Sequence, residues 1–320
     1  MAVLIEGSDL RKRFGEILAV DGISLQVNKG EVLGFLGPNG AGKSTTMKML
    51  TGFLEPDAGS ARIAGIDVLD EPKRAKRKLG YLPEGAPCYG DMSVRAFLRF
   101  IAEIRGFEGE EVKRRVGAAV DKTQLASVLE QKIDTLSKGF KRRVAIAQAI
   151  LHDPQVLIMD EPTDGLDPNQ KHQVRQLIST MAADKAIIVS THILEEVEAV
   201  CSRAVIINRG RIVADGTAED LMARLPHHNT ISLHVATGRA EAVAKALTEF
   251  AAIASVERVG AANGKIRLRA LPSPAAPVPS ELASLIRARV IEAEEVSVER
   301  GNLDDVFRQI TTSDAGTSHA

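Results

Sequence analysis

The stretch Gly37-Pro38-Asn39-Gly40-Ala41-Gly42-Lys43-Ser44-Thr45 fits the phosphate-binding pattern G-x-x-x-x-G-K-[ST]. An apolar run at residues 32–36 precedes it and a helical pattern at residues 45–50 follows, which is the order that this loop needs. Its glycines let backbone N–H groups turn toward phosphate oxygens, and the helix N-terminus adds partial positive charge. We expect Lys43 to reach the β- and γ-phosphates of a nucleotide and Ser44 to bind Mg²⁺. The stretch predicts a nucleotide site and leaves the use of the nucleotide open.

Length and composition are those of an ordinary globular protein. The chain has 320 residues, 44% of them hydrophobic, and a formal net charge of −1, so nothing attracts it as a whole to nucleic acid or anionic lipid. Cys88 and Cys201 lie in unrelated contexts and predict neither a disulfide framework nor a metal site. The sequence has no signal-peptide pattern and no apolar window near the roughly 18 residues of a membrane span. We therefore expect a cytoplasmic protein, or one lying peripherally on a membrane where another subunit supplies the pore.

The order of predicted elements indicates two domains. Residues 1–225 alternate short apolar runs with helical patterns, which predicts a parallel α/β core with a helical subdomain at about residues 85–150. Residues 226–311 read as strand, helix, two strands, helix, strand and a final helix, which predicts a small α+β ferredoxin-like domain. Four prolines between positions 271 and 279 predict a stiff loop, and residues 312–320 a disordered tail. The strands predicted in the first domain include residues 23–27, 32–36, 156–159, 186–190 and 204–207.

Two carboxylates end a buried strand pattern at Val156-Leu157-Ile158-Met159-Asp160-Glu161. Asp160 is expected to hold the Mg²⁺ shell, and Glu161 to polarise an attacking water as general base. Ser137 is expected to cap a helix that continues to Leu151, and such a helix start can bind phosphate. His192 follows an apolar strand and is placed to touch a γ-phosphate, although a histidine at a strand end is more often an ordinary hydrogen-bonded residue.

Taken in order, these motifs resemble the ATP-binding cassette family, the ATPase subunits of ABC transporters. The resemblance covers about residues 3–220 and implies an ATP hydrolase fold with a parallel core sheet, an antiparallel edge sheet and a helical subdomain. It implies catalytic roles for Glu161, His192 and Lys43. The matching motifs are Walker A at residues 37–45, the signature at Leu136-Ser137-Lys138-Gly139-Phe140, Walker B at residues 156–161, the D-loop at Asp164-Gly165-Leu166-Asp167 and the switch histidine at His192.

The resemblance also implies ATP and Mg²⁺ as ligands and a head-to-tail dimer of two nucleotide-binding subunits. Each ATP then lies between Walker A of one subunit and the signature of the other, so that Ser137 and Gly139 contact the γ-phosphate in trans. Phe14 resembles the aromatic residue that stacks on adenine, the alternative being a core or surface Phe near an edge strand. The implied Mg²⁺ ligands are Ser44, Glu84 and Asp160. The implied nucleotide-binding residues are Phe14, Gly37, Pro38, Asn39, Gly40, Ala41, Gly42, Lys43, Ser44, Thr45, Glu84, Ser137, Gly139, Asp160 and Asp167, the last of which crosses the interface.

The sequence departs from the family pattern at two motifs. Glu84 stands where the Q-loop usually has Gln, and a carboxylate can bind Mg²⁺ but offers no amide donor. Two interpretations stay open: catalysis tolerates Glu84, or Glu84 tightens the dependence on Mg²⁺. Lys138 and Phe140 replace Gly and Gln of the signature, whereas Ser137 and Gly139 are kept, so both sites of a homodimer are expected to be competent.

These departures also resemble a branch of bacterial ATPases that pair with ABC-2-type membrane permeases, similar to those of gliding-motility and related export systems. The string Leu303-Asp304-Asp305-Val306-Phe307 matches a pattern common near the end of such export ATPases. The branch implies a permease partner and a place on the inner face of the cell membrane.

Other functions fit the sequence less well. Ribosome-acting cassette ATPases resemble two cassettes in tandem, whereas this chain has one phosphate loop. DNA-repair relatives place a long coiled coil between Walker A and the signature, and only about 100 positions separate Gly37 from Ser137. A GTPase needs an Asn-Lys-x-Asp string after the phosphate loop, and the nearest string, at residues 28–31, precedes it and ends in Glu. The basic residues between 73 and 78 follow acidic ones at the spacing of a solvated helix, so we expect no nucleic-acid partner.

Overall fold

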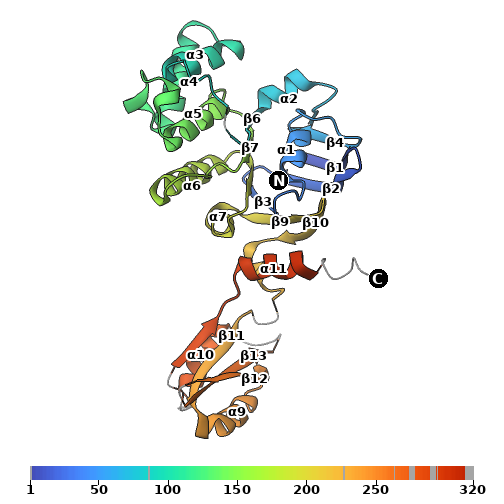
Figure 1. The fold of residues 1–320 in the computed structure, drawn as a ribbon, viewed down its shortest axis with the longest axis vertical. Helices are drawn as coiled ribbons and strands as arrows, with labels where there is room; N and C mark the ends of the chain where they lie inside the picture. Colours follow the sequence, from blue (N-terminus) through green and yellow to red (C-terminus); the bar gives the residue numbers. More distant parts are fainter. Residues whose placement is uncertain are drawn as a thin grey trace. The chain divides into compact units, whose positions relative to one another are not determined.

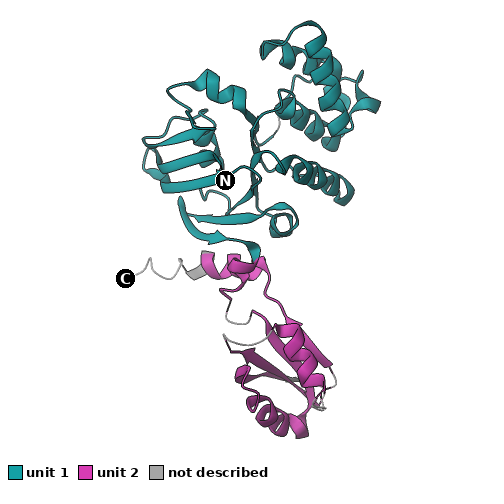
Figure 2. Cartoon of the chain, turned by 180° about the vertical axis from the view of Figure 1, so that it is seen from behind, with its two compact units in different colours: residues 1–218 teal, residues 219–320 magenta. Residues whose placement is uncertain are grey.

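The chain folds as two compact units, residues 1–218 and 219–320 (Figure 1; Figure 2). The computed structural model describes residues 2–85, 87–225, 228–262, 264–273, 278–288, 293 and 295–313. The sequence places the domain boundary after residue 225, a few residues later than this division. The short helix α8 (Ala218–Met222) lies between the two positions.

A six-stranded sheet forms the centre of the first unit. Its order is β10-β9-β3-β8-β7-β6, and all neighbours are parallel except β10, which is antiparallel to β9. Every residue of β3, β7 and β8 is buried, as is typical of a parallel sheet covered on both faces. The predicted parallel α/β core is confirmed. The strands are β3 (Val32–Leu36), β6 (Leu79–Leu82), β7 (Val156–Asp160), β8 (Ala186–Thr191), β9 (Arg203–Asn208) and β10 (Arg211–Gly216).

A second, antiparallel sheet packs on this core in the order β2-β1-β4-β5. Its strands are β1 (Val3–Phe14), β2 (Ile17–Asn28), β4 (Ala58–Ile63) and β5 (Ile66–Asp67). Residues 23–27, predicted among the strands of the parallel core, lie in β2 of this sheet instead. Their buried and exposed residues alternate from Ile23 onward, as expected for a strand with one face in the core.

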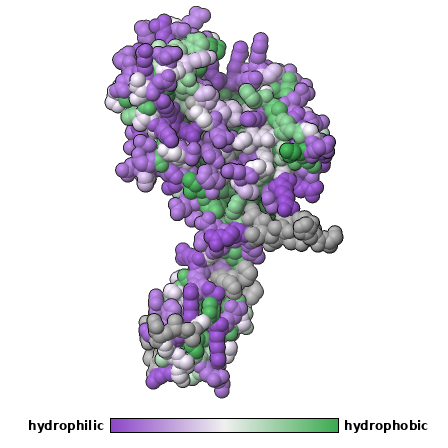
Figure 3. Space-filling model, viewed as in Figure 1, coloured by the Kyte–Doolittle hydropathy of each residue, from purple (hydrophilic) through white to green (hydrophobic). Residues whose placement is uncertain are grey.

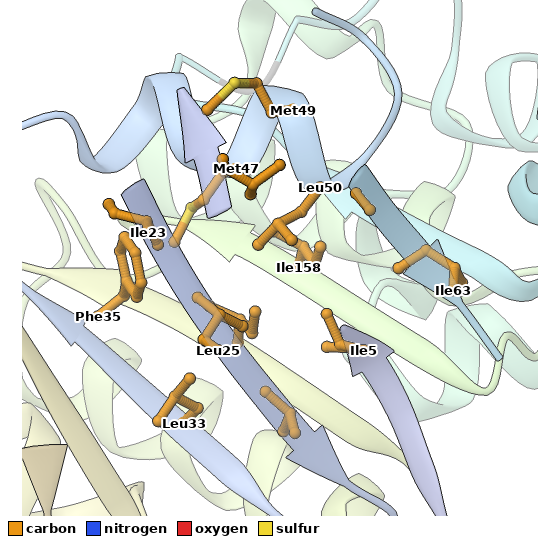
Figure 4. Close-up of a cluster of buried hydrophobic side chains, with 14 of the residues drawn as sticks. Ile5, Ile23, Leu25, Leu33, Phe35, Met47, Met49, Leu50, Ile63 and Ile158 are labelled. Carbon is orange, nitrogen blue, oxygen red and sulfur yellow. The ribbon is translucent and has the colours of Figure 1, made fainter. Parts of the chain in front are cut away.

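One hydrophobic cluster joins the two sheets to helix α1 (Lys43–Leu50), which follows the phosphate loop. Figure 4 shows side chains of Ile23 and Leu25 from the antiparallel sheet beside Phe35 from the parallel sheet, with Met47 of α1 pointing among them. These side chains are buried, so Met47 holds α1 against strands of both sheets. This packing fixes the phosphate loop that joins β3 to α1.

The helical subdomain has its own core. Helices α3 (Val94–Ile104), α4 (Gly109–Thr123) and α5 (Lys138–Ile150) enclose a cluster that includes Phe97, Leu98 and Val144. The predicted helices of this region are therefore present. Helix α2 (Pro72–Lys78) buries only Ala75, and its basic side chains are exposed, which supports the surface interpretation. Helices α6 (Pro168–Ala182) and α7 (Leu194–Val200) pair with each other in the same unit.

His152 lies just after α5 and makes the stability of this unit sensitive to acid. It is buried, and its Nε2 lies 3.0 Å from the carbonyl oxygen of Leu79 in β6. Burial lowers the pKa of His152 from 6.5 to about 3, and the nearby charge of Arg105 lowers it further. Below pH 6.5 the unfolded chain therefore binds a proton that the folded chain does not, so stability is lost as the pH falls from 6.5 toward 3.

We expect the free energy of unfolding to fall by about 1.4 kcal/mol between pH 7.5 and 5.5 because of this one residue. The matched variant is His152→Gln, whose amide keeps a hydrogen-bond donor toward Leu79 but does not titrate. Urea unfolding followed by circular dichroism at the two pH values measures the difference. An equal loss in the parent and in His152→Gln would contradict the assignment to His152.

The second unit has a four-stranded antiparallel sheet in the order β12-β13-β11-β14. Helices α9 and α10 pack with it around a buried cluster that includes Leu233, Leu247 and Ile286. The predicted order of elements is present, and the ferredoxin-like classification stays a prediction. The elements are β11 (Thr230–Ala236), α9 (Ala240–Thr248), β12 (Ile253–Ala262), β13 (Lys265–Pro272), α10 (Pro279–Ala288), β14 (Glu295–Glu299) and α11 (Leu303–Ser313).

Two predictions at the end of the chain need correction. Leu271 and Pro272 continue β13 and do not belong to a loop, and residues 312–313 belong to α11 and not to a disordered tail. The proline-rich residues 274–277 and the last residues, 314–320, lie outside the described residues. None of the helices in the described part of the chain has the length and the apolar composition that crossing a bilayer requires.

Candidate nucleotide site

The phosphate loop between β3 and α1 follows a path that its glycines permit. Gly42 has φ of 103°, and a Cβ there would lie 2.4 Å from the carbonyl oxygen of Ala19. A Cβ on Gly37 would lie 2.6 Å from the carbonyl oxygen of Ile207. Backbone that approaches this closely leaves no room for a side chain, and a left-handed φ disfavours any residue but glycine. The loop is therefore held tightly against neighbouring backbone, as the sequence predicts for a phosphate cradle.

Lys43 is the first residue of α1, and its side chain folds back over the loop. It is buried, and its Nζ donates hydrogen bonds to two loop carbonyls, those of Gly37 at 2.7 Å and Pro38 at 3.2 Å. Burial lowers the pKa of Lys43, while the charges of Glu161, Asp160 and Glu84 raise it. The predicted lysine, both Walker B carboxylates and the Q-loop carboxylate therefore share one electrostatic environment.

Asp160 and Glu161 lie where β7 ends, beside the end of β8. Asp160 is buried and accepts a hydrogen bond from Ser190 Oγ, while the backbone N–H of Glu161 donates to Ser190 Oγ at 3.1 Å. The Nδ1 of His192 lies 3.0 Å from Glu161 Oε1. Glu161 has φ of 48°, a conformation that costs about 1–3 kcal/mol in a non-glycine residue and that is concentrated at functional sites. The structure thus brings together the predicted base and the predicted switch histidine.

The signature residues start a different helix. Ser137 caps α5, as predicted, by accepting a hydrogen bond from the backbone N–H of Phe140 at 3.4 Å. Gly139 is buried, and a Cβ there would lie 2.3 Å from Gln170 Oε1 on α6. Asp167 caps α6 by accepting from the backbone N–H of Gln170 at 3.0 Å. The role of Asp167 across an interface stays a prediction, since these contacts lie within one chain.

The signature and the phosphate loop do not meet within the chain. Figure 1 shows α5 and α1 on opposite sides of β6 and β7. In the described part of the chain, no hydrogen bond or ion pair joins residues 136–140 to residues 37–45. Ser137 is exposed at its helix start. Within one chain, therefore, the signature residues do not reach a nucleotide that is held by the phosphate loop.

Phe14 and Glu84 occupy the edges of the site. Phe14 ends β1 with 48% of its surface exposed, and Lys12 Nζ lies 5.9 Å from the centre of its ring. Because the ring of Phe14 is exposed, its face is open to a stacking partner. The role of Phe14 in stacking on adenine stays a prediction. Glu84 follows β6, is exposed and acts electrostatically on Lys43. Its role as a Mg²⁺ ligand also stays a prediction.

Arg142 is a site residue to which the sequence alone assigned no role. It is buried on α5, its Nη1 makes no hydrogen bond within the described structure, and burial lowers its pKa. The charges that raise its pKa again are those of Asp164, Glu161, Asp160 and Glu84. The sequence feature that could have identified Arg142 is its position three residues after Gly139, which places both residues on the same side of the helix. Arg142 therefore places a cation of the helical subdomain within electrostatic reach of the carboxylates predicted to be catalytic.

The residues around the loop suit Mg²⁺ by their donor chemistry. Ser44 supplies a hydroxyl in the first turn of α1 and Asp160 a buried carboxylate, which are the hard oxygen ligands that Mg²⁺ prefers. No group of three or more His, Cys, Asp or Glu residues able to hold a metal occurs in the part of the chain that the structure describes. The protein therefore supplies a few ligands, and phosphate oxygens would have to complete the shell.

The phosphate loop, the paired Walker B carboxylates and the parallel sheet define a P-loop nucleotide-binding ATPase. The ABC transporter family matches residues 20–164. Over 309 residues the chain is 32% identical to the linearmycin resistance ATP-binding protein LnrL of Bacillus subtilis (strain 168). The match covers 96% of this chain and 98% of LnrL. The chain belongs to the family of ABC transporter ATP-binding subunits and carries its ATPase cassette, which confirms the resemblance.

Two further comparisons agree with this result. The chain is 36% identical over 222 residues to the probable multidrug ABC transporter ATP-binding protein YbhF of Escherichia coli (strain K12). That match covers 69% of this chain but only 38% of the length of YbhF. A solved structure described as the ATP-binding subunit of an ABC transporter has a TM-score of 0.64 and 33% identity, over 69% of this chain and 92% of that one. The predicted ABC ATPase fold is thus confirmed for the first unit.

Proposed function

We propose that the chain binds and hydrolyses ATP to power export through a separate ABC-2-type membrane permease, and that two copies close around ATP in each cycle. This places the chain at the cytoplasmic face of the cell membrane. The name of another relative supports the direction of transport: a protein of Paraburkholderia xenovorans (strain LB400), 39% identical over 220 residues, is named Nod factor export ATP-binding protein I. The departures at Glu84 and in the signature support the ABC-2 branch.

The observation that carries the proposal is the division of the ATP site within one chain. The phosphate loop, Asp160, Glu161 and His192 lie together, while Ser137 begins a helix on the other side of β6 and β7 (Figure 1). An exposed helix N-terminus with a serine cap is suited to a phosphate group that comes from elsewhere. A second copy of the chain, turned head to tail, supplies each loop with the missing Ser137.

Each residue then has a defined task. Lys43 leaves its loop carbonyls to contact the β- and γ-phosphates, at the N-terminus of α1. Glu161 accepts a proton from the attacking water, and His192, hydrogen-bonded to Glu161 Oε1, orients that carboxylate. Ser44 and Asp160 would hold Mg²⁺, which when bound would supply positive charge to the phosphate oxygens. Ser137 of the second copy completes the contacts to the γ-phosphate.

The helical subdomain offers a surface for the permease. Tyr89 and Ile104 are 60% and 64% exposed, and the ring of Tyr89 packs edge-on against Phe97 at 6.0 Å and Phe100 at 5.7 Å. Figure 3 shows small hydrophobic patches among hydrophilic side chains on the face in view. The segment from residue 85 begins directly after Glu84, so the surface adjoins the ATP site in the sequence. A cytoplasmic helix of the permease with apolar side chains fits this surface.

Co-purification tests the partner. We expect the tagged chain to retain a membrane protein encoded beside it, because exposed aromatic and aliphatic side chains act as anchors of interfaces. A double variant, Tyr89→Ser with Ile104→Ser, is expected to lose at least about 1 kcal/mol of binding, a fivefold or larger drop in recovery. Leu285→Ser, which removes an exposed apolar side chain from α10, serves as the control. If neither the parent nor the control chain retains any such membrane protein, the transporter function is contradicted.

A further inference from the structure

Glu196 is a buried carboxylate that connects the two loops of the catalytic pair. It lies on α7 with 4% of its surface exposed. Its Oε2 accepts a hydrogen bond from Thr163 Oγ1 at 2.5 Å and another from Thr191 Oγ1 at 3.0 Å. Both threonines are buried as well. One carboxylate oxygen therefore ties together two segments that lie 28 positions apart in the sequence.

The two threonines adjoin the residues that form the catalytic pair. Thr191 directly precedes His192, and its Oγ1 also accepts a hydrogen bond from the backbone N–H of Ile193 at 3.0 Å, so the backbone on both sides of His192 is fixed. Thr163 lies two residues after Glu161, within the turn that begins the D-loop. Fixing both threonines to Glu196 thus fixes the separation between His192 and Glu161.

Two cations lie within ion-pair distance of the other oxygen of the same carboxylate, Oε1, which accepts no hydrogen bond among the described residues. Lys171 Nζ lies 3.2 Å and Arg175 Nη2 3.7 Å from Glu196 Oε1, and both residues are on α6. A buried carboxylate is stable in its charged form only where cations and hydrogen-bond donors compensate for lost hydration. Because α6 begins directly after Asp167 of the D-loop, these ion pairs connect the carboxylate to a third element of the site.

We propose that Glu196 is a positioning residue for hydrolysis: through Thr163 and Thr191 it sets the contact between His192 Nδ1 and Glu161 Oε1. The inference rests on the proposed ATPase function. Glu196 touches neither the phosphate loop nor the signature by any hydrogen bond or ion pair among the described residues. It therefore acts on the rate of hydrolysis and not on the binding of ATP, which depends on the loop around Lys43.

Three variants separate this role from a structural one. Thr163→Val and Thr191→Val each keep the side-chain shape and remove one hydroxyl, and Glu196→Gln removes the charge but keeps an acceptor oxygen. Glu31→Gln is the matched control, since Glu31 is a largely buried carboxylate that pairs with Arg203 away from the catalytic pair. For each variant, kcat, the Kd of a fluorescent ATP analogue and the thermal midpoint are measured.

We expect kcat to fall about tenfold to a hundredfold in Thr163→Val, Thr191→Val and Glu196→Gln, because small misplacements of catalytic groups cost this much. The Kd is expected to stay within about twofold of the parent. Glu31→Gln is expected to keep the parent kcat even where its thermal midpoint falls. The inference is overturned if kcat follows the thermal midpoint across all four variants, or if kcat stays at the parent value in both threonine variants.

A second measurement does not depend on turnover. In protein labelled with ¹³C-histidine, the ring resonance of His192 is expected to shift in Thr163→Val, although Thr163 is 29 positions away in the sequence. His192→Asn assigns that resonance. An unshifted resonance in both Thr163→Val and Glu196→Gln overturns the positioning role. If the parent hydrolyses no ATP, the proposed function fails, and the resonance still decides whether Glu196 sets the geometry of the pair.

Discussion

Glu161→Gln is expected to lower kcat for ATP hydrolysis by about a hundredfold to ten-thousandfold and to leave ATP binding intact. The amide has the shape of the carboxylate but cannot accept a proton from water. The backbone of residue 161 is held by hydrogen bonds to Ser190, so the substitution does not disturb the end of β7. ATP affinity depends on the loop around Lys43, whose hydrogen bonds do not involve the side chain of residue 161.

The same variant is expected to accumulate as an ATP-bound dimer. In the proposed cycle, hydrolysis separates two copies closed around ATP, so a copy that binds but does not hydrolyse ATP is expected to stay closed. Size-exclusion chromatography with and without ATP measures the dimer, and phosphate release measures kcat. Glu195→Gln, an exposed neighbour of Glu196 on α7, is the control for loss of one negative charge. Turnover that persists in Glu161→Gln would remove Glu161 from the role of general base.

The parts of the site that the sequence predicted are those built from consecutive residues. The phosphate loop, the strand that ends in Asp160 and Glu161 and the serine cap of α5 each follow from a local pattern of glycine, apolar and polar residues. The parallel sheet then brings the ends of β7 and β8 together, since adjacent parallel strands end at the same edge. The contact between Glu161 and His192 follows from this arrangement, whereas the sequence predicted only that His192 touches the γ-phosphate.

Other features depend on contacts between distant segments and carry little local signal. Glu196 lies in a run of acidic and apolar residues that reads as an ordinary surface helix, yet its side chain is buried by partners from three elements. Arg142 reads as one of several basic residues after the signature, and only its burial distinguishes it. Residues 23–27 read as a buried strand in either sheet, because a short apolar run does not specify its neighbours.

Mixing two inactive variants is expected to restore hydrolysis. Lys43→Ala removes the loop lysine, and Ser137→Arg blocks the signature, so each variant alone is expected to have at most about a hundredth of the parent activity. In a head-to-tail dimer of one copy of each, one of the two sites combines the intact Lys43 of one chain with the intact Ser137 of the other. Random pairing at equal concentration makes half of the dimers mixed, so about a quarter of the parent activity should return.

The choice of partner variant makes this result specific to a site shared between copies. Mixing Lys43→Ala with Glu161→Gln is the matched control, because both residues belong to the same half of the site. Every site in that mixed dimer then lacks one of the two residues, and no activity should return. If Ser137 acted on the phosphate loop of its own chain, the first mixture would stay inactive as well. Recovery in the first mixture alone therefore requires that the helix cap at α5 and the loop before α1, separated within the chain by β6 and β7, meet across two copies.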